Sequence, residues 1–277
     1  MEIKAPAKIN LFLNVGQRRS DGFHDIYSIM VKVSLFDTLI FHEAENISIE
    51  GPDWLPQEEN IAYKAAVLLK NFCGCAKGCR IVLEKEIPAG RGLGGGSSDA
   101  AAVLKGLNSF WNLGLTGPEL EKLGAELGSD VNFFFNRGAA IAAGRGEIII
   151  PVDEADIPAR KVMLIDPGIH VPTRNIYENY TGNVLYEKKA LDGIIAQYIS
   201  GSWESLLKND LEKTVFRLYP VIRALKERLT NWGMPSLLSG SGSSVFALVD
   251  DASKAAAAAK IIEENFEFRV WTVDIIS

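Results

Sequence analysis

The sequence predicts an α+β protein with two domains. The chain has 277 residues, a length that suits one large or two modest domains. Strand-like and helix-like patterns of hydrophobic residues mix in its first half and again in its second half. The segment 151–160 between them holds Pro, Asp and Glu but few large apolar residues. We therefore predict an N-terminal domain over residues 1–155 and a C-terminal domain over residues 156–277.

The first half contains the clearer local signals. Apolar and β-branched residues predict strands over 9–15, 31–41, 80–87 and 139–150. Apolar residues at helical spacing predict an amphipathic helix over 56–72. A further helix is expected to open at Ser97. The pair Thr116 and Glu119 forms a capping box that starts another helix, which is expected to end near Gly128.

The second half predicts three more strands and several helices. Strand-like segments cover 161–166, 245–249 and 268–276. Helices are expected between Tyr186 and Arg228. The alanine-rich segment 253–266 has high intrinsic helix propensity and predicts a further helix.

Composition and charge limit the classes of function. Hydrophobic residues make up 47% and charged residues 23%, the balance of a globular protein. The 29 Lys and Arg residues against 35 Asp and Glu residues give a net charge of −6. An acidic chain is a poor candidate for binding nucleic acid, although a local site for a small phosphate ligand remains possible.

Membrane and targeting signals are not found in the sequence. No uncharged apolar run approaches the roughly 20 residues that span a bilayer. The N-terminal residues lack the apolar core of a signal peptide. We therefore expect a cytoplasmic protein without a membrane partner, and the sequence leaves its oligomeric state open.

The cysteines form one short cluster. Cys73, Cys75 and Cys79 are the only cysteines, and their odd number fits a reducing compartment. Their spacing is not the paired pattern of a zinc site, and no histidine is close in sequence. We favour a helix end and turn that carry thiols, and we predict no metal ligand.

A glycine-rich loop is the strongest chemical signal. The segment 88–96 formally matches G-x-G-x-x-G, which is weak alone, and a P-loop is excluded because Gly96 stands where lysine is required. Consecutive glycines let backbone N–H groups approach a phosphate, and a following helix N-terminus adds donors. Ser97 and Ser98 add hydroxyls for a helix cap, a phosphate or Mg²⁺. We favour an anion-binding loop over a flexible turn with Ser98 as the helix N-cap.

Three segments together resemble the GHMP kinase superfamily. The segment 87–101 resembles its phosphate-binding motif, 5–11 its first motif and 239–246 its third. The resemblance implies the two-domain GHMP kinase fold, with a ribosomal-protein-like N-terminal domain and a ferredoxin-like C-terminal domain. It also implies a kinase that uses ATP and Mg²⁺.

Three more segments are similar to one subfamily of these kinases. The ranges 8–15, 18–26 and 128–134 resemble the GHMP kinases that phosphorylate 4-diphosphocytidyl-2-C-methyl-D-erythritol. The resemblance implies transfer of the γ-phosphoryl group of ATP to the 2-hydroxyl of this cytidine diphosphate-linked methylerythritol. That reaction belongs to the non-mevalonate route to isoprenoid precursors. The alternatives are a GHMP kinase for another alcohol, or a catalytically silent ligand sensor.

Two residues are the catalytic candidates. Asp130 follows a predicted helix and precedes an apolar run, and the resemblance makes it the general base rather than a loop aspartate. Lys8 lies among apolar residues at the start of a strand, where its charge would keep Asp130 ionised and stabilise the reacting phosphoryl group. The alternative for Lys8 is a solvated lysine at a strand edge.

Further site residues follow mainly from the resemblance. Asn10 shares a strand face with Lys8 and is expected to touch substrate or phosphate, unless it only faces solvent. Phe23 and His24 suit stacking on a pyrimidine and hydrogen bonding to its edge, although packing is the commoner role of such a pair. The resemblance assigns Tyr177 to the second aromatic wall. The segment 240–244, notably Gly240 and Ser241, is expected to shape the floor of the substrate site, and a structural turn is the alternative.

The ATP-binding set extends along the glycine-rich loop. The predicted phosphate-binding residues are Pro88, Ala89, Gly90, Arg91, Gly92, Leu93, Gly94, Gly95, Gly96, Ser97 and Ser98. Asn60, before a predicted helix, is a candidate for contact with the nucleoside, and a helix N-cap is the equal alternative.

Overall fold

The computed structural model describes residues 1–153, 160–182, 185 and 188–276. The protein is α+β, as the sequence predicts. It forms two compact units. The first comprises Met1–Ala7, Leu35–Ala89 and Gly94–Arg137; the second comprises Lys8–Ser34, Gly90–Leu93 and Gly138–Ser277. The predicted domain boundary at 155/156 lies outside the described residues and stays a prediction.

The first unit combines a small part of the sheet with three helices. It takes the start of β1 (Glu2–Arg18) and the end of β2 (His24–Ala44). Its other elements are β3 (Ile47–Glu50), a 3-10 helix (Gln57–Glu59), α1 (Ile61–Cys73), β4 (Gly78–Glu84), α2 (Gly95–Phe110), α3 (Gly117–Leu127) and a second 3-10 helix (Asn132–Phe135).

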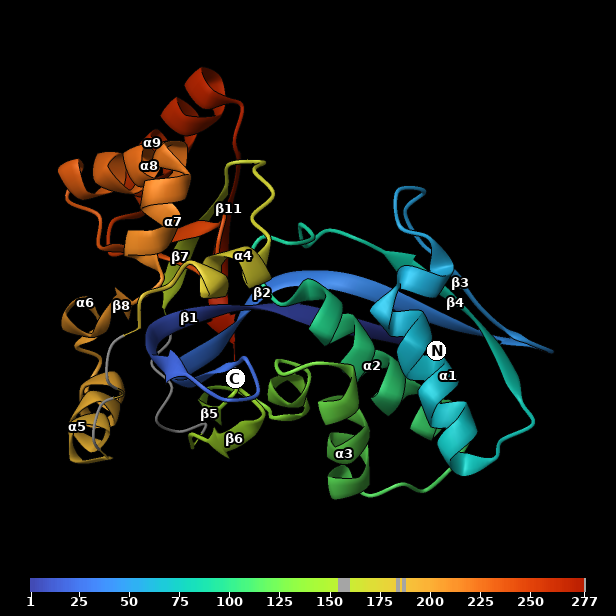
Figure 1. Cartoon of the computed structure of the whole chain (residues 1–277). Helices are drawn as coiled ribbons and strands as arrows, with labels where there is room; N and C mark the ends of the chain where they lie inside the picture. The colour runs from blue at the N-terminus through green and yellow to red at the C-terminus, as the bar shows by residue number, and fades with distance from the viewer. Residues whose placement is uncertain (154–159, 183–184, 186–187, 277) are drawn as a thin grey trace. The chain divides into compact units, whose positions relative to one another are not determined.

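A glycine lets helix α2 of this unit pack closely against the sheet. Strand β4 pairs antiparallel with β2 and parallel with β3. Helices α1, α2 and α3 contact one another, as Figure 1 shows. A Cβ atom on Gly106 of α2 would lie 2.5 Å from the ring of Phe41 on β2. This glycine therefore allows α2 to approach the strand.

The second unit holds most of the sheet and the remaining helices. It takes β1 from Lys8 onward and the start of β2. Its other elements are β5 (Ala140–Gly144), β6 (Ile148–Pro151), β7 (Lys161–Asp166), α4 (Thr173–Glu178), α5 (Lys188–Ile199), α6 (Trp203–Leu206), β8 (Lys208–Asn209), α7 (Glu212–Leu218), α8 (Pro220–Asn231), β9 (Ser236–Leu238), β10 (Val245–Val249), α9 (Ala252–Phe266) and β11 (Arg269–Ile276).

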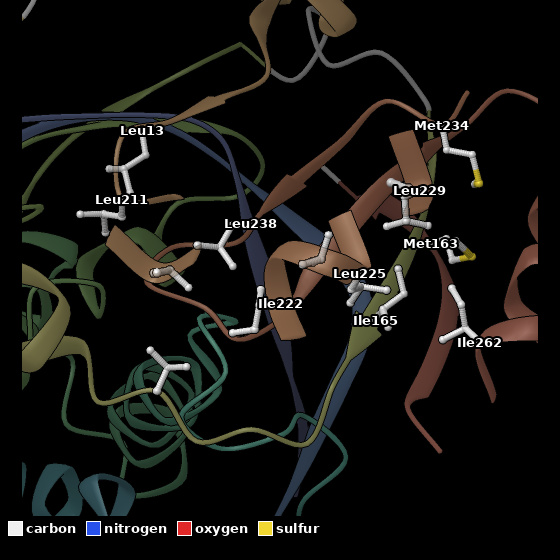
Figure 2. Packing of buried hydrophobic residues seen from close by; sticks show 14 of the residues in the cluster. Leu13, Met163, Ile165, Leu211, Ile222, Leu225, Leu229, Met234, Leu238 and Ile262 are labelled. Carbon is white, nitrogen blue, oxygen red and sulfur yellow. The ribbon is translucent and has the colours of Figure 1, made fainter. Parts of the chain in front are cut away.

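Antiparallel strands and amphipathic helices build the core of this unit. Strand β10 pairs with β9 and β7, and β11 pairs with β7 and with Lys32 and Val33 of β2. Met163 and Ile165 of β7 share one hydrophobic cluster with residues of α8 such as Leu225 (Figure 2). The apolar faces of α7, α8 and α9 are therefore buried in this unit.

Most of the predicted elements are confirmed, with instructive differences. The predicted bounds of β7 and β10 agree with the structure. The prediction of one strand over 139–150 is wrong, because β5 and β6 are separated by a turn with positive φ angles at Gly144 and Gly146. The short elements β3, β9 and α4 were not predicted from the sequence. Within the described residues, no helix has the length and apolar character needed to cross a membrane.

Candidate functional site

The first half of the glycine-rich loop lies against the segment 239–244 of the same unit. Gly92 has a φ of 77°, and a Cβ atom there would lie 2.0 Å from the backbone oxygen of Ser239. The Ser239 hydroxyl donates a hydrogen bond of 2.9 Å to the carbonyl oxygen of Gly92. Only glycine allows this approach, because any side chain would overlap the facing backbone.

Backbone hydrogen bonds bring the three motif segments together. The Lys8 N–H donates to the Leu93 carbonyl at 2.9 Å, and the Ser244 N–H donates to the Arg91 carbonyl at 3.1 Å. Residues of the first and third motif segments therefore both donate backbone hydrogen bonds to residues 91–93 of the glycine-rich loop. These segments are far apart in the sequence, and their parts in the second unit, residues 8–11, 90–93 and 239–246, are in contact.

Lys8 and Asn10 form a buried polar chain on β1. Both residues are 4% exposed, so neither is a solvated strand residue. The Lys8 ammonium donates to Asn10 Oδ1 at 2.6 Å, and Asn10 Nδ2 donates to the Ser28 hydroxyl at 2.7 Å. The Ser28 hydroxyl in turn donates to the Phe12 carbonyl at 2.8 Å. The predicted shared strand face of Lys8 and Asn10 is confirmed.

Gly240 lies beside the hydrogen-bonded side chains of Lys8 and Asn10. It has a φ of 55°, and a Cβ atom there would lie 3.4 Å from Lys8 Nζ and 3.4 Å from Asn10 Oδ1. Its neighbour Ser241 is buried, and the Ser241 and Thr173 hydroxyls lie 2.8 Å apart. The loop that carries Gly240 is therefore in contact both with the Lys8 ammonium and with the start of α4.

The Arg91 side chain supports the loop from the outside. Its Nε lies 3.1 Å from Asp166 Oδ1 at the end of β7, and its Nη2 donates to the Gly168 carbonyl at 3.0 Å. The guanidinium is thus engaged by protein groups.

The second half of the loop opens helix α2 in the first unit. Gly94 has a φ of 70° and is the N-cap, so the helix begins at Gly95, two residues before the predicted start at Ser97. Ser98 lies inside the helix, with its N–H bonded to the Gly94 carbonyl at 2.9 Å. The alternative of Ser98 as the N-cap is therefore wrong. A glycine cap has no side chain to satisfy the first N–H groups, which leaves them for an anion.

Ser98 carries a buried hydroxyl at this helix end. Its Oγ has no hydrogen-bond partner within the part of the chain that the structure describes. A buried hydroxyl without a partner is costly, because it has lost its hydrogen bonds to water. The geometry therefore fits a ligand oxygen near Ser98.

A buried ion triad ties the first turns of α2 to the sheet. Lys85 contacts both Asp37 and Asp99, and its ammonium lies 2.7 Å from Asp99 Oδ2. Asp37 Oδ1 also accepts hydrogen bonds from the N–H groups of Glu86 (2.7 Å) and Ile87 (2.8 Å). The triad thus joins β2, the residue that follows β4, and helix α2.

Burial perturbs the ionisation of the triad. Burial raises the pKa of Asp99 to about 8, opposed by the Lys85 charge and reinforced by Asp37. For Lys85, burial works to lower the pKa, but the charges of Asp99 and Asp37 outweigh it and raise the pKa. One lysine facing two carboxylates leaves Asp99 as the group that keeps a proton.

Two further predicted residues lie in the first unit. Asp130 is half-buried between α3 and the 3-10 helix Asn132–Phe135. Asn60 is buried, and its Oδ1 accepts from the Ala62 N–H at 2.9 Å, so it is the N-cap of α1. A Cβ atom on Gly96 would lie 3.3 Å from Ile61 Cγ2, which places the starts of α1 and α2 next to each other.

The predicted pyrimidine-binding residues gather at one end of β2 in the second unit. His24 opens β2 and is buried rather than exposed on a loop, whereas Phe23 is 51% exposed in the preceding turn. The His24 ring centroid lies 5.6 Å from that of Tyr177 on α4 and 5.7 Å from that of Tyr180. His24 Nδ1 lies 2.8 Å from the Gly16 carbonyl. Because a carbonyl only accepts, Nδ1 carries a proton in this contact.

Arg145 also lies in this region, although its place there was not predicted from the sequence. Its guanidinium lies 5.1 Å from the centre of the Phe23 ring, and its N–H donates to Glu147 Oε2 at 2.6 Å. Arg145 sits in the β5–β6 turn, which the prediction of a single strand over 139–150 concealed. The pattern Gly144-Arg145-Gly146 was the available signal for that turn.

The cysteines and acidic residues give no metal cluster. No group of three or more His, Cys, Asp or Glu side chains suited to a metal ion occurs among the described residues. Cys73 and Cys75 are partly exposed, and burial raises the pKa of the Cys79 thiol to about 11. A thiol with that pKa is protonated at neutral pH.

Family comparisons cover both halves of the chain. The model described as "GHMP kinases N terminal domain" matches residues 60–140, and the model described as "GHMP kinases C terminal" matches residues 189–267. Together they match more than half of the chain.

Individual proteins give a finer comparison. The 4-diphosphocytidyl-2-C-methyl-D-erythritol kinase of Thermodesulfovibrio yellowstonii is 40% identical and is aligned over 94% of this chain and 93% of its own length. A crystal structure of 4-(cytidine 5'-diphospho)-2C-methyl-D-erythritol kinase has a TM-score of 0.84 at 34% identity, covering 100% of both chains. The homoserine kinase from Cytophaga hutchinsonii has a TM-score of 0.76 at 16% identity, covering 100% of this chain and 95% of its own. This last likeness shows the fold alone.

The fold, the three joined motif segments and these matches define an ATP-dependent small-molecule kinase with the GHMP kinase fold. Within that superfamily, the chain belongs to the 4-diphosphocytidyl-2-C-methyl-D-erythritol kinase family.

We predict that Gly92→Ala weakens ATP binding. The methyl group would overlap the Ser239 carbonyl and force the two loops apart, so the KM for ATP should rise about 10-fold. Gly114→Ala is the matched control, because Gly114 has a similar φ of 71° but no atom within 4 Å of a new Cβ. Both variants carry a backbone strain of about 1–2 kcal/mol, measurable by urea denaturation. Equal ATP KM values in the two variants would contradict the steric argument.

We predict that Asp99→Asn changes the pH dependence of stability. Between the ordinary pKa of 3.8 and about 8, the unfolded chain has lost the Asp99 proton while the folded protein keeps it. The free energy of unfolding therefore falls as pH rises, by up to about 1.4 kcal/mol per pH unit. Urea denaturation from pH 5 to 7.5 should show a shallower fall in the variant. The raised Lys85 pKa acts only above 10.5, outside this window. Parallel curves would contradict a protonated Asp99.

Proposed function

We propose that the chain transfers the γ-phosphoryl group of ATP to the 2-hydroxyl of 4-diphosphocytidyl-2-C-methyl-D-erythritol. The observation that carries the proposal is the 40% identity to a kinase of that name over nearly the whole of both chains. The local geometry supplies a physical basis for each part of the reaction.

The glycine-rich loop and the start of α2 are the proposed site of the ATP phosphates. Positive φ angles at Gly90, Gly92 and Gly94 turn the backbone without side chains in the way. The uncapped N–H groups of α2 and the partial positive charge of the helix end favour an anion. The Ser98 hydroxyl, which has no partner among the residues that the structure describes, would donate to a phosphate oxygen.

The aromatic cluster at the start of β2 is the proposed site of the cytidine group. The exposed ring of Phe23 offers a face for stacking, and Tyr177 would form the second wall. His24 Nε2 is available for the edge of the base, since the Gly16 carbonyl fixes Nδ1 as a donor. Arg145 already covers one face of Phe23, so the base would stack on the other face or replace the guanidinium.

Asp130 and Lys8 are the proposed catalytic residues. The Asp130 carboxylate would accept the proton of the attacking hydroxyl, and the Lys8 ammonium would neutralise charge on the transferred phosphoryl group. The hydrogen bond from Lys8 to Asn10 fixes the direction of the lysine side chain before substrate arrives. Preorganised charge of this kind is worth more in a buried site than in water.

Mg²⁺ would reach the site on the ATP phosphates. It keeps several waters and needs only one or two protein oxygens beside the phosphates, which fits a site without an acidic cluster among the described residues. Ser98 Oγ, which has no hydrogen-bond partner among the described residues, is the protein oxygen that fits this role best. When bound, the ion would neutralise phosphate charge.

A substrate panel tests the proposal. Purified protein with ATP and Mg²⁺ would receive 4-diphosphocytidyl-2-C-methyl-D-erythritol, mevalonate, homoserine or galactose, with ATP consumption measured in each case. We expect turnover with the cytidyl substrate alone. Turnover with another alcohol would overturn the proposed substrate but not the kinase. ATP binding without turnover on any alcohol would favour a ligand sensor.

We predict that Asp130→Asn lowers kcat by about 100- to 10,000-fold, because the amide cannot accept the hydroxyl proton. The affinity for ATP, measured by calorimetry, should change little. Asp192→Asn, which removes an exposed carboxylate on α5, is the control for charge. Turnover close to that of the unmodified protein would remove Asp130 from the role of base.

We predict that Phe23→Ala raises the KM for the cytidyl substrate by about 5- to 150-fold, the loss expected from one base–aromatic stack. The KM for ATP should stay nearly unchanged. Phe72→Ala removes a similarly exposed ring at the end of α1 and serves as the matched control. Equal effects on both KM values would place Phe23 outside the pyrimidine site.

A further inference from the structure

Asn209 lies outside all the motif segments but contacts one of them directly. It belongs to the two-residue strand β8, where it pairs with Leu13 of β1 in parallel register. Its Nδ2 donates to the Leu238 carbonyl at 2.9 Å and to the Gly240 carbonyl at 2.7 Å. Its Oδ1 accepts from the Leu211 N–H at 2.9 Å. One side chain that is 6% exposed therefore fills three hydrogen-bonding roles.

The partners fix the orientation of this amide. Two carbonyl oxygens face Nδ2 and one N–H faces Oδ1, so a flipped amide would set acceptor against acceptor. No other side chain of this size has two N–H donors on one atom and an acceptor beside it. The flanking side chains of Leu13, Leu211 and Leu238 share one hydrophobic cluster, which excludes water from the amide (Figure 2).

The carbonyl that Asn209 holds belongs to the turn beside Lys8. A Cβ atom on Gly240 would lie 3.4 Å from Lys8 Nζ and from the Gly92 carbonyl oxygen. The same loop bonds to the glycine-rich loop through the Ser239 hydroxyl and through the Ser244 N–H. A shift of Gly240 would therefore move groups next to the lysine ammonium and next to the phosphate loop together.

The neighbouring residue anchors Asn209 to the other end of β1. Asp210 Oδ2 accepts from Asn14 Nδ2 at 2.7 Å and from the Val15 N–H at 3.0 Å, and its own N–H donates to the Leu13 carbonyl at 3.0 Å. Residues 209 and 210 are thus bonded to β1, the strand that carries Lys8. From this position the Asn209 side chain binds the turn at Gly240.

We propose that Asn209 is a positioning residue for phosphoryl transfer, which acts by holding the 238–242 turn against Lys8 and the glycine-rich loop. The inference rests on the proposed roles of Lys8 and of that loop. Asn209 itself touches neither ATP nor acceptor in this role.

The test is Asn209→Asp, which keeps the acceptor for Leu211 but sets a carboxylate against two carbonyl oxygens. We expect kcat to fall by about 10- to 100-fold, the effect of a small misplacement of reacting groups, and ATP affinity to fall severalfold. Hydrogen exchange should become at least about 10-fold faster at the Ser239, Gly242 and Ser244 amides, whose hydrogen bonds belong to the turn. Exchange in β7 and β10 should stay unchanged.

Two further variants separate positioning from general destabilisation. Leu225→Val removes one methylene from the core of the same unit, and it should lower the melting temperature without changing kcat. Asn209→Ser, a neutral change that keeps an acceptor for Leu211, covers the case in which the aspartate variant does not fold. Asn209→Ser should lower kcat and ATP affinity and speed exchange in the turn in the same way, but by smaller factors.

Three outcomes overturn the inference: unchanged exchange in the turn, faster exchange with kcat and ATP affinity within twofold of the unmodified protein, or an equal loss of kcat in Leu225→Val. Failure of the proposed acceptor is distinguishable, because the unmodified protein would then not turn over the cytidyl substrate. In that case, weaker ATP binding and faster exchange in Asn209→Asp would still support the inference.

Discussion

The second unit depends on one close approach between two stretches of backbone. Gly92 lies so near Ser239 that a single methyl group would not fit between them. Because the contact is backbone to backbone, the hydrogen bonds from Ser239, Ser244 and Lys8 all converge on residues 91–93. The glycines of the loop are therefore explained first by packing. Their freedom to present N–H groups to a phosphate follows from the same geometry.

The polar side chains next to this contact are buried and linked by hydrogen bonds, from Lys8 to Asn10 and from Asn10 to Ser28. Burying Lys8 would be unfavourable without the acceptor on Asn10, and Asn10 in turn needs Ser28. A chain of this kind holds the ammonium in one direction, at the cost of desolvating three polar side chains. In the first unit, Asp37 is a comparable buried polar group. It accepts hydrogen bonds from two backbone N–H groups just after β4, and it forms an ion pair with Lys85.

Local patterns in the sequence were sufficient for the regular elements and for the loop. Strands β7 and β10 were predictable because uninterrupted apolar runs end at polar residues, and the loop was recognisable because five of the seven residues 90–96 are glycine. The start of α2 was placed two residues late because glycine disfavours helices, and here the tertiary packing of Gly95 against Ile87 overrides that propensity. Asn209 gave no signal, because its bonds to Leu238 and Gly240 span 29 and 31 residues.

The two sides of the proposed site are built from different kinds of contact. Around the glycine-rich loop, the protein contacts run largely through backbone atoms, as in the bonds to Arg91 and Leu93, which tolerate many side chains but require glycine at Gly92. Around His24, the contacts are between side chains, such as the rings of Tyr177 and Tyr180. Substitutions in this second group would alter the proposed acceptor site without touching the loop. In a fold with this division, substitutions around the acceptor site can change the acceptor while the phosphate donor stays the same.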